Sequence, residues 1–392
     1  MHADHQPPAR RPPLEGLIVA DFSRVLAGPL AAMVLGDLGA EVIKVERPEG
    51  DDTRAWGPPW AADGTSTYFQ SVNRNKRSVV LDLREDDDRA LALRLIQRAD
   101  VLIENFRPGA MERFGLGEAA TRALNPRLVS CSVTGFGAGE GAALPGYDLL
   151  IQAVGGLMSI TGQTDGQPTK VGVALVDVIA GLFATVAILA ALAERERSGL
   201  GQRAEVSLMG SLLAALVNQA SGFLGAGAVP GRMGNRHPSI APYESFDAAD
   251  GEIVVAVGND RQFAALCREL DTAALAADQR FATNAARVEH RTALSEALGP
   301  RFATRPREAL AVALNSVGVP CGPVNDVRDA FAMAETLGLG SIVEMADGVR
   351  QVANPISLGG TPVGYRRVPP QLGADDAAVR AWLLEDDDVL GG

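Results

Sequence analysis

Short apolar runs alternate with helix-like segments through the first third of the chain. The runs are rich in Val, Ile and Leu and predict strands, whereas the segments between them have the spacing of helices. The predicted strands are Leu17–Phe22, Glu41–Glu46, Ser78–Leu83, Val101–Phe106 and Leu128–Val133, with helices at Gly28–Ala40 and Glu85–Arg98. Strands that alternate with helices favour an α/β domain with a largely parallel sheet.

The pattern changes near Ala220, after a long helix that begins near Asp177 and a strand–helix pair at Ala204–Ala220. Beyond a segment rich in Gly and Pro, Asp250-Gly251 between two β-prone runs predicts a hairpin, and helices follow. The predicted organisation is a disordered tail at 1–13, a large domain at 14–220, a linker at 221–229, a small α+β domain at 230–329 and a C-terminal segment at 330–392 that returns to the large domain.

Size and charge limit the possible functions. A chain of 392 residues exceeds one ordinary core, so two domains are expected. Its composition, 47% hydrophobic and 21% charged, is typical of a soluble globular enzyme. The net charge of −12 argues against nucleic acid as a partner, because binding to phosphates needs Lys and Arg. A small anionic ligand stays possible, since local basic clusters matter more than the total.

Neither the N-terminus nor the cysteines indicate export or membrane insertion. The first 13 residues lack the apolar stretch of a signal peptide. The most apolar run, Val178–Ala193, is short for a membrane span and predicts a buried helix. Cys131, Cys267 and Cys321 are far apart, which fits neither a disulfide framework nor a zinc site. We therefore expect a cytoplasmic protein with no membrane partner.

Several common cofactor and catalytic signatures are missing from the sequence. No GxGxxG follows the first predicted strand; Gly137, Gly139 and Ala142 fit the looser GxGxxA form, but Pro145 prevents a clean helix start there. The chain has no Walker loop and no GxSxG, and its four histidines include no pair at metal-ligand spacing. We expect no metal and no permanently bound cofactor.

Asp177 is conspicuous because it lies between two apolar stretches, Val171–Val176 and Val178–Ala193. Burial of a carboxylate costs several kcal/mol unless the group is hydrogen-bonded or neutralised. One interpretation is that Asp177 is the N-cap of the helix that follows. The other is nucleophilic catalysis. The two are compatible, because N–H groups at a helix start keep a carboxylate ionised while dry surroundings leave it reactive.

Basic residues gather around the ends of the predicted strands. They are Lys44, Arg47, Arg74, Lys76, Arg77, Arg84, Arg107 and Arg113. Ligands of parallel sheets bind at the carboxyl ends of the strands, so this cluster is a candidate rim for an anionic nucleotide. A scattered, solvated face is the alternative interpretation.

Five longer motifs carry a resemblance to a known family. They are DFSRVLAGPLAAMVLGDLGAEVIKVERPEGDDTR (Asp21–Arg54), NRNKRSVVLDL (Asn73–Leu83), ENFRPGAMERFGLG (Glu104–Gly117), PGYDLLIQAVGGLMSITG (Pro145–Gly162) and the segment around Asp177. In this order they resemble the family III CoA-transferases, which include formyl-CoA transferase, carnitine CoA-transferase and the α-methylacyl-CoA racemases. The motifs extend over nearly the whole chain.

The resemblance implies a reaction, a set of contacts and a fold. Asp177 would attack an acyl-CoA thioester to form a mixed anhydride and then an aspartyl-CoA thioester, and the acceptor carboxylate would reverse these steps. The implied CoA contacts are Val25, Ala27, Arg47, Leu81, Arg84, Asn105, Phe106, Arg113 and the loop of Leu144, Pro145, Gly146, Tyr147 and Asp148. The implied fold is a Rossmann-like large domain with a smaller α+β domain, and two chains interlock as a homodimer.

Tyr147 bears on the choice between transfer and racemisation. The racemases carry Gly-His-Asp where this chain has Gly146-Tyr147-Asp148, and they use that His as a base. A tyrosine is unionised at pH 7 and is a poor base, so transfer is favoured and a 2-methylacyl-CoA racemase or epimerase is the alternative. Tyr147 would either donate a hydrogen bond to the developing oxyanion or pack on CoA.

Two further segments, Gly50–Trp60 and His237–Phe263, resemble the subgroup that contains succinate–hydroxymethylglutarate CoA-transferase. That resemblance implies succinyl-CoA as donor and a dicarboxylic acid as acceptor. A dicarboxylate needs a cation for its distal end, and Arg236 and His237 are the candidates, with ordinary linker polarity as the alternative. The four-glycine loop of formyl-CoA transferase is absent, which disfavours formyl or oxalyl transfer.

Overall fold

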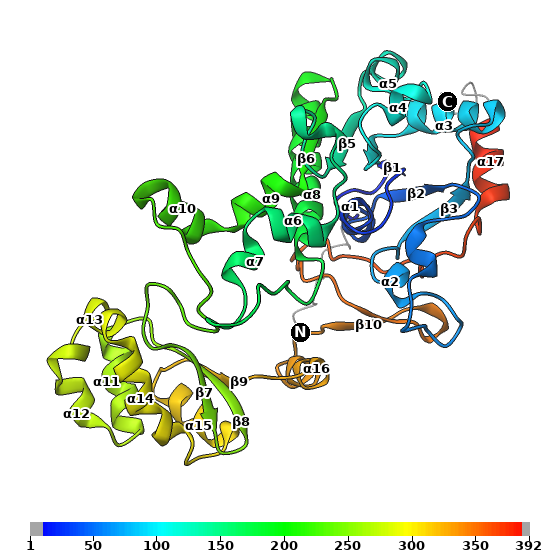
Figure 1. The fold of residues 1–392 in the computed structure, drawn as a ribbon. Helices are drawn as coiled ribbons and strands as arrows, with labels where there is room; N and C mark the ends of the chain where they lie inside the picture. The colour runs from blue at the N-terminus through cyan, green and yellow to red at the C-terminus, as the bar shows by residue number, and fades with distance from the viewer. Residues whose placement is uncertain (1–10, 386–392) are drawn as a thin grey trace. The chain divides into compact units, whose positions relative to one another are not determined.

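The computed structural model describes residues 11–385, the side chain of residue 347 excepted, and divides the chain into two compact units (Figure 1). The large unit comprises the described residues up to Leu157, Val171–Ala226 and the described residues from Gly340 onward. The small unit comprises Met158–Lys170 and Gly227–Leu339. Most of the predicted disordered tail, 1–13, lies outside the described residues.

A six-stranded parallel sheet forms the centre of the large unit, as the sequence predicts. Its strands are β1 Ile18–Asp21, β2 Glu41–Glu46, β3 Lys76–Val80, β4 Val101–Glu104, β5 Val129–Thr134 and β6 Arg203–Ser207. They lie in the order β3-β2-β1-β4-β5-β6, and every neighbouring pair is parallel. The chain order reverses between β1 and β4, which is where ligands of such sheets bind.

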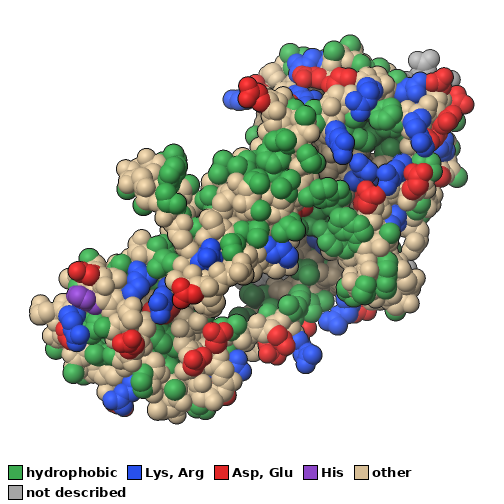
Figure 2. Space-filling view, viewed as in Figure 1, with side chains coloured by type: hydrophobic (Ala, Val, Ile, Leu, Met, Phe, Trp, Pro, Cys, Tyr) green, Lys and Arg blue, Asp and Glu red, His purple; other side chains and the backbone are tan. Residues whose placement is uncertain are grey.

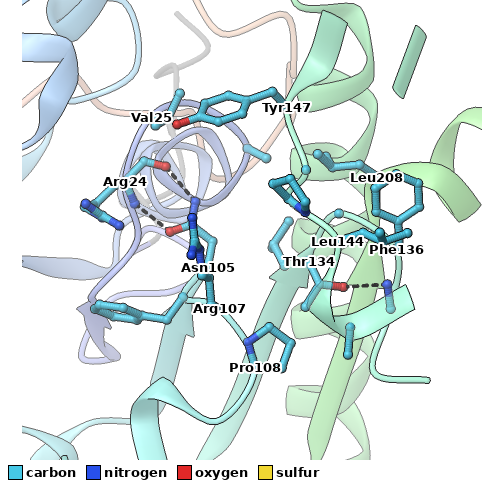
Figure 3. Close-up of a pocket in the computed structure, with 18 of the residues that line it drawn as sticks. Arg24, Val25, Asn105, Arg107, Pro108, Thr134, Phe136, Leu144, Tyr147 and Leu208 are labelled. Carbon is cyan, nitrogen blue, oxygen red and sulfur yellow. Dashed lines mark hydrogen bonds between the residues drawn. The ribbon is translucent and has the colours of Figure 1, made fainter. Parts of the chain in front are cut away.

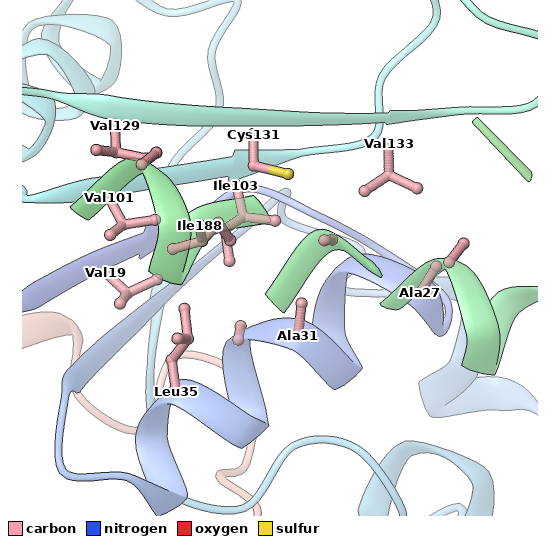
Figure 4. Packing of buried hydrophobic residues seen from close by; sticks show 14 of the residues in the cluster. Val19, Ala27, Ala31, Leu35, Val101, Ile103, Val129, Cys131, Val133 and Ile188 are labelled. Atoms are coloured by element: carbon pink, nitrogen blue, oxygen red, sulfur yellow. The ribbon is translucent and has the colours of Figure 1, made fainter. Parts of the chain in front are cut away.

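Helices cover both faces of this sheet. The helices of the large unit are α1 Ala27–Asp37, α2 Thr67–Gln70, α3 Asp86–Arg98, α4 Ala110–Arg113, α5 Glu118–Leu124, α6 Asp148–Val154, α8 Leu175–Ser198, α9 Leu208–Ala215, α10 Val217–Ala226 and α17 Asp376–Leu384, while α7 Leu157–Ile160 spans the boundary between the units. One core packs α1, α8 and α9 on the sheet (Figure 4), and the other packs α3 and α17 on the opposite face.

Alternation along each strand explains the two cores. Val19 of β1 belongs to the core under α1 and α8, whereas its neighbour Ala20 belongs to the core under α3. Val101 and Leu102 of β4 divide in the same way. Successive side chains of a strand point to opposite faces, so a strand buried on both faces is apolar throughout.

Strand β3 begins two residues earlier than predicted. Its first residue is a lysine, which an apolar pattern does not assign to a buried strand. Lys76 is fully buried, and its Nζ donates to Asp21 Oδ2 at 2.9 Å, to Pro29 O at 2.9 Å and to Asn73 Oδ1 at 3.0 Å. Burial lowers the pKa of Lys76 to about 8, while the Asp21 carboxylate opposes that shift. A polar residue can therefore lie inside a strand when its charge is compensated.

The outer strand β3 is covered by the segment that leads into α17. Asp375 Oδ2 accepts from Ser78 N at 3.0 Å, and Asp376 Oδ1 accepts from Val80 N at 2.7 Å. The N–H of Asp375 donates to Ser78 O at 3.0 Å. Val379 and Leu383 of α17 are fully buried in the core beside it. The C-terminal segment thus pairs the backbone of an edge strand.

Three boundaries differ from the sequence prediction. The small unit extends to Leu339 and not to the predicted 329, because helix α16, Val327–Thr336, runs across the predicted boundary. The predicted linker 221–229 is helical as far as Ala226, because α10 runs from Val217 to Ala226. Glycine within a helix costs only about 1 kcal/mol relative to Ala, so Gly222 and Gly225 do not end it. Residues 158–170, expected in the large domain, belong to the small unit, where Gly162 O accepts from Gly234 N at 3.0 Å.

Helix α8 is longer than the apolar run from which it was predicted. It has 24 residues, and by length and composition alone it could cross a membrane, as could the bent pair α9 and α10. One face of α8 is buried in the core of the large unit, through Val176, Ala180, Ala184 and Ile188. Residues four apart lie on one face of a helix, so this is the packing of a core helix.

The small unit contains an antiparallel sheet with helices around it. Its strands are β7 Tyr243–Ala248, β8 Gly251–Ala256 and β9 Cys321–Pro323, so the predicted hairpin at Asp250-Gly251 is confirmed. Its helices are α11 Asp260–Glu269, α12 Ala273–Ala277, α13 Asn284–Glu289, α14 Arg291–Phe302, α15 Arg307–Ser316 and α16 Val327–Thr336. A second hairpin, β10 Ile342–Glu344 with β11 Arg350–Val352, lies in the C-terminal part of the large unit.

Candidate active site

Two adjoining cavities lie at the carboxyl ends of β1, β4 and β5. The first, of about 450 Å³, contains Asp177 and is shown in Figure 3; the second, of about 550 Å³, lies over the ends of β2 and β3. Arg24, Phe106, Arg107 and Arg113 line both. The two cavities therefore form one continuous candidate site in the large unit, at the sheet edge where a ligand was expected.

The loop after β1 is held in a fixed conformation. Asn105 Oδ1 accepts from Arg24 N at 2.9 Å, and Asn105 Nδ2 donates to Arg24 O at 2.7 Å (Figure 3). Val25 has φ of 72°, a rare value for a β-branched residue, and its N–H donates to the Asp51 carboxylate at 3.3 Å. Such strain persists only where neighbouring groups impose it.

Asp177 is half-buried in the first turn of α8 and lines the first cavity. The helix begins at Leu175 with Ala174 as N-cap, so the prediction that Asp177 is the N-cap is wrong. Among the residues described, none donates a hydrogen bond to its carboxylate. Burial, followed by the negative charge of Asp148, raises the pKa of Asp177 to about 7. This carboxylate is poorly solvated and is not used in any structural contact.

Asp148 takes over the capping of α8. Its Oδ1 accepts from Val176 N at 2.8 Å, and its Oδ2 accepts from Gln152 Nε2 at 2.6 Å. Gln152 is buried and in turn accepts from Val171 N at 2.8 Å. Asp148 lines neither cavity, so its contact with CoA stays a prediction, while its hydrogen bonds show that it positions the start of α8.

The other predicted CoA contacts come together in the two cavities. Val25, Ala27, Asn105, Phe106, Arg113, Leu144, Pro145, Gly146 and Tyr147 line the first. Arg47, Leu81, Arg84, Phe106 and Arg113 line the second. Residues far apart in sequence thus meet because the carboxyl ends of parallel strands share one edge of the sheet.

The loop that carries Tyr147 passes unusually close to the end of β5. A Cβ on Gly146 would lie 2.4 Å from Gly135 Cα, so only glycine fits at this crossing. The Tyr147 side chain is 63% exposed, and its ring reaches toward Val25 (Figure 3). Its hydroxyl is therefore accessible to a ligand in the first cavity.

The arginines of the site differ in whether an acidic side chain already neutralises their charge. Arg47 Nη2 lies 2.5 Å from Asp52 Oδ1, and Arg84 Nη2 lies 2.6 Å from Asp82 Oδ2. Arg107 and Arg113 form no ion pair with any acid in the described part of the chain. These two guanidinium groups at the junction of the cavities are available to an anionic ligand.

Arg236 and His237 lie in the small unit and line neither cavity. Arg236 Nε is 3.2 Å from Glu244 Oε2, and His237 Nδ1 accepts from Ser239 N at 3.0 Å. Each side chain already has a polar partner within its own unit. Their assignment to the distal carboxylate of a substrate stays a prediction.

Sequence reasoning missed Arg24, which lines the site, and Tyr68, which lies outside both cavities but within electrostatic reach of Asp177. Arg24 lines both cavities, and its guanidinium lies 5.8 Å from the centre of the Phe106 ring. Burial raises the pKa of Tyr68 to about 12, with further contributions from the charges of Asp177, Asp148 and Asp51. Tyr68 therefore lies within electrostatic reach of Asp177. Arg24 follows the first strand and could have been found from that position, whereas no spacing in the sequence connects Tyr68 with Asp177.

Within residues 11–385, no three His, Cys, Asp or Glu side chains lie close enough together to hold a metal ion. The donors at this site are instead arginines, an asparagine, Tyr147 and backbone N–H groups. Such a set suits an anionic ligand with carbonyl groups.

Comparisons with known proteins agree with this description. The family model described as CoA-transferase family III matches residues 14–376. A succinate–glutarate CoA-transferase of Agrobacterium fabrum is 44% identical over 96% of this chain and 97% of its own length. A succinyl-CoA:glutarate CoA-transferase of Mus musculus is 40% identical over 96% of this chain and 87% of its own. The crystal structure of a CAIB/BAIF family protein from Brucella suis has a TM-score of 0.87 and 43% identity, covering 95% of this chain and 100% of that one.

Proposed function

Because the chain belongs to CoA-transferase family III and is therefore an enzyme of the transferase class, we propose that it moves CoA from succinyl-CoA to a dicarboxylic acid through covalent intermediates on Asp177. The observation that carries the proposal is the carboxylate itself. Asp177 has no hydrogen-bond donor among the described residues, is half-buried, and opens into the cavity that collects nine of the predicted CoA contacts.

The proposed steps balance without an added proton or cofactor. The Asp177 carboxylate attacks the thioester carbonyl, and the C–S bond breaks to give a mixed anhydride and the CoA thiolate. The thiolate attacks the Asp177 carbonyl of the anhydride, which releases the donor acid and leaves an aspartyl-CoA thioester. The acceptor carboxylate attacks the Asp177 carbonyl of that thioester, and the C–S bond breaks to give a second mixed anhydride and the thiolate. The thiolate attacks the acceptor carbonyl of this anhydride, which forms the new acyl-CoA and releases the Asp177 carboxylate. Two covalent exchanges thereby replace one difficult transfer.

The two cavities suggest how CoA is held. We assign the nucleotide end to the second cavity, where Arg47 and Arg84 lie at the rim and Leu81 lines the wall. Arg107 and Arg113 would bind the phosphates of CoA at the junction of the cavities. The uncharged pantetheine arm would extend past them into the first cavity. There the thioester meets Asp177, and Tyr147 is in position to donate to the oxyanion that develops.

The acids named in the relatives support a dicarboxylic acceptor. Both relatives described above are named for transfer involving succinate or succinyl-CoA and glutarate. Tyr68 lies within electrostatic reach of Asp177, and its ring packs against that of Trp56, 5.1 Å away between centroids. Glutarate is accordingly the first acceptor to test.

The enzyme is proposed to act as a homodimer. Apolar side chains on α8, α9 and α10 are exposed, among them Phe183, Val186, Leu213, Phe223 and Leu224. Figure 2 shows hydrophobic side chains gathered on this face. Such a surface on a soluble protein marks an interface, and with a net charge of −12 an anionic membrane is a poor occupant. A second copy of the chain is the occupant we propose.

The test is to trap the covalent intermediate. Wild-type enzyme is incubated with succinyl-CoA and hydroxylamine, and the peptide that contains Asp177 is examined by mass spectrometry. We expect a hydroxamate on Asp177 and succinyl-CoA-dependent formation of glutaryl-CoA. Asp177→Ala should lose both signals, and Asp87→Ala, a change at an exposed aspartate of α3, should lose neither.

Full transferase activity in Asp177→Ala would overturn the assignment of the nucleophile. Incorporation of solvent deuterium at the α-carbon of a 2-methylacyl-CoA, without exchange between acids, would favour racemisation instead. Tyr147 in place of a basic histidine argues against that outcome.

A further inference from the structure

Gly181 is fully buried where α8 crosses the first turn of α1. A Cβ at this position would lie 2.7 Å from the carbonyl oxygen of Ala27, 3.2 Å from Leu30 Cδ2 and 3.3 Å from Leu30 Cβ. Contacts of a real Cβ below 3.0 Å are essentially never seen, and the group in the way is backbone, which cannot turn aside. The two helices approach this closely only because residue 181 has no side chain.

This close crossing lies one helical turn from the nucleophile. Residues four apart share one face of an α-helix, so Asp177 and Gly181 face the same neighbour. Val25, Leu26 and Ala27 line the same cavity as Asp177. The separation between α8 and α1 at Gly181 therefore sets how near Asp177 lies to the start of α1.

The start of α1 offers unpaired donors. Its N-cap, Leu26, makes no side-chain cap, and the first turn contains no acidic residue. No group in the described ranges accepts from the N–H of Leu26, Ala27 or Gly28, and the next residue is Pro29. The N-terminal N–H groups of a helix carry partial positive charge and favour a neighbouring anion.

Gly181 brings no local benefit to its own helix. Glycine within a helix costs about 1 kcal/mol relative to Ala. The crossing is instead built from small residues on both sides, with Ala27 and Ala31 of α1 (Figure 4) against Ala180 and Ala184 of α8. The effect of glycine at this position is that α8 and α1 lie closer together.

We propose that Gly181 is a positioning residue for the nucleophile: it lets α8 lie against the first turn of α1 and so sets how close the Asp177 carboxylate lies to the N–H groups of that turn. The inference rests on the proposed function, in which an oxyanion forms at the Asp177 carbonyl when the CoA thiolate attacks the anhydride and again when the acceptor attacks the aspartyl-CoA thioester.

A wider crossing would change both the rate and the pH dependence. The charged and titratable groups around Asp177 are Asp148, Tyr68 of α2, and the cavity residues Arg24, Asp52, Arg107, Arg113 and Tyr147. Burial is the main reason that the pKa of Asp177 is raised. Water admitted between the helices would therefore lower this pKa toward its ordinary value.

The experiment compares Gly181→Ala with Gly299→Ala. Gly299 lies in helix α14 of the small unit, and a Cβ there would have nothing within 4 Å. For Gly181→Ala we expect kcat to fall about 10- to 100-fold, because a misplacement of about 1 Å has effects of this size. The Kd of free CoA, measured by calorimetry, should change less than about threefold. The acid limb of kcat/KM should move to lower pH. Gly299→Ala should match the wild type in all three.

Two outcomes would overturn the inference. One is a folded Gly181→Ala enzyme with wild-type kcat and an unmoved acid limb. The other is a parallel loss of kcat, CoA binding and thermal stability, which would mean that the glycine serves packing alone. If Gly181→Ala does not fold, the double variant with Leu30→Ala is measured in the same way, because loss of Leu30 Cδ2 leaves room for α8 to move away from the Ala27 carbonyl.

This test is separate from that of the proposed function. An active Asp177→Ala enzyme would refute the function itself. An inactive Asp177→Ala enzyme together with an unaffected Gly181→Ala enzyme would refute the positioning role alone.

Discussion

Asp177 lies in the first turn of α8, and Asp148 of α6 caps that turn. The two aspartates differ in role because they differ in hydrogen bonding. Asp148 accepts from Val176 N and from Gln152 Nε2, so its charge is held by two donors. Asp177 has neither donor, and its pKa is raised to about 7 by burial and by the charge of Asp148. Asp148 therefore fixes the helix that carries the nucleophile and also makes that nucleophile more basic.

Asp148→Asn should separate these two effects. The amide oxygen can still accept from Val176 N, but the negative charge is gone, so the pKa of Asp177 should fall. Attack needs the ionised carboxylate. Activity of the wild type is therefore lost as pH falls through about 7, and the variant should stay active to lower pH. The measurement is kcat/KM for succinyl-CoA as a function of pH.

Asp148→Ala serves as the companion variant. It should show the same displacement of the acid limb, with a further loss of about 0.5–2 kcal/mol in unfolding free energy because the cap is removed. An acid limb that stays fixed in both variants would show that Asp148 does not influence the charge state of Asp177.

At the scale of helices and strands, the sequence predicts most elements that bury apolar residues. Leu17–Phe22 and Val101–Phe106 contain β1 and β4. The errors occur where polarity and burial disagree: Lys76 begins β3 because Asp21 compensates its charge, and α8 begins at Leu175, ahead of the charged residue taken as its cap. A local sequence pattern does not show which residues, distant in sequence, will become partners in the folded protein.

The same limit applies to the candidate site. Arg47 and Arg113 were predicted as a rim because each follows a strand, and parallel strands bring their ends together. The capping role of Asp148 was not predicted because its partner Val176 is 28 residues away and is brought to it by the fold between α6 and α8. Tyr68 was not found because only the tertiary structure brings it within electrostatic reach of Asp177.

Asp37, at the end of α1, joins three parts of the large unit. Its buried carboxylate accepts from Arg74 Nε at 2.9 Å and Nη2 at 2.6 Å, from Asn75 Nδ2 at 2.7 Å and from Asn354 Nδ2 at 2.9 Å. The turn before β3 and the C-terminal segment are thereby tied to α1. Arg74 is itself buried, so its charge depends on this partner.

Asp37→Ala should lower the free energy of unfolding by about 3–5 kcal/mol, because it leaves the Arg74 cation buried without compensation. Glu118→Ala, which removes an exposed pair with Arg122, is the control and should cost less than about 1 kcal/mol. Denaturant unfolding of both variants gives the comparison. Equal and small effects would mean that the Asp37 contacts do not stabilise the large unit.

For the whole molecule, the exposed apolar face on α8, α9 and α10 has consequences for assembly. Leu224 is 81% exposed and Phe223 is 53% exposed, although α10 is otherwise a regular helix. Side chains of this kind rarely lie together in water on a monomer. The face is accounted for if a second copy of the chain covers it.

The proposed homodimer predicts a mass in solution of twice 40.9 kDa, measured by light scattering after gel filtration. The double variant Phe223→Asp/Leu224→Asp should shift the protein toward 40.9 kDa or into aggregates, because charge in an apolar interface is unfavourable. Val312→Asp, at an exposed apolar residue of α15 in the small unit, should keep the wild-type mass. A wild-type protein of 40.9 kDa would contradict the dimer.

The pairing of Asp375 and Asp376 with β3 also determines the order in which the molecule can be completed on the ribosome. All six strands of the sheet have been synthesised by Ser207, yet the outer edge of β3 and the core beneath α17 stay open until residues near Leu384 emerge. During that interval the nascent chain presents an unpaired edge strand, which is a template for aggregation. The last helix described therefore protects the newly made protein as well as stabilising the finished one.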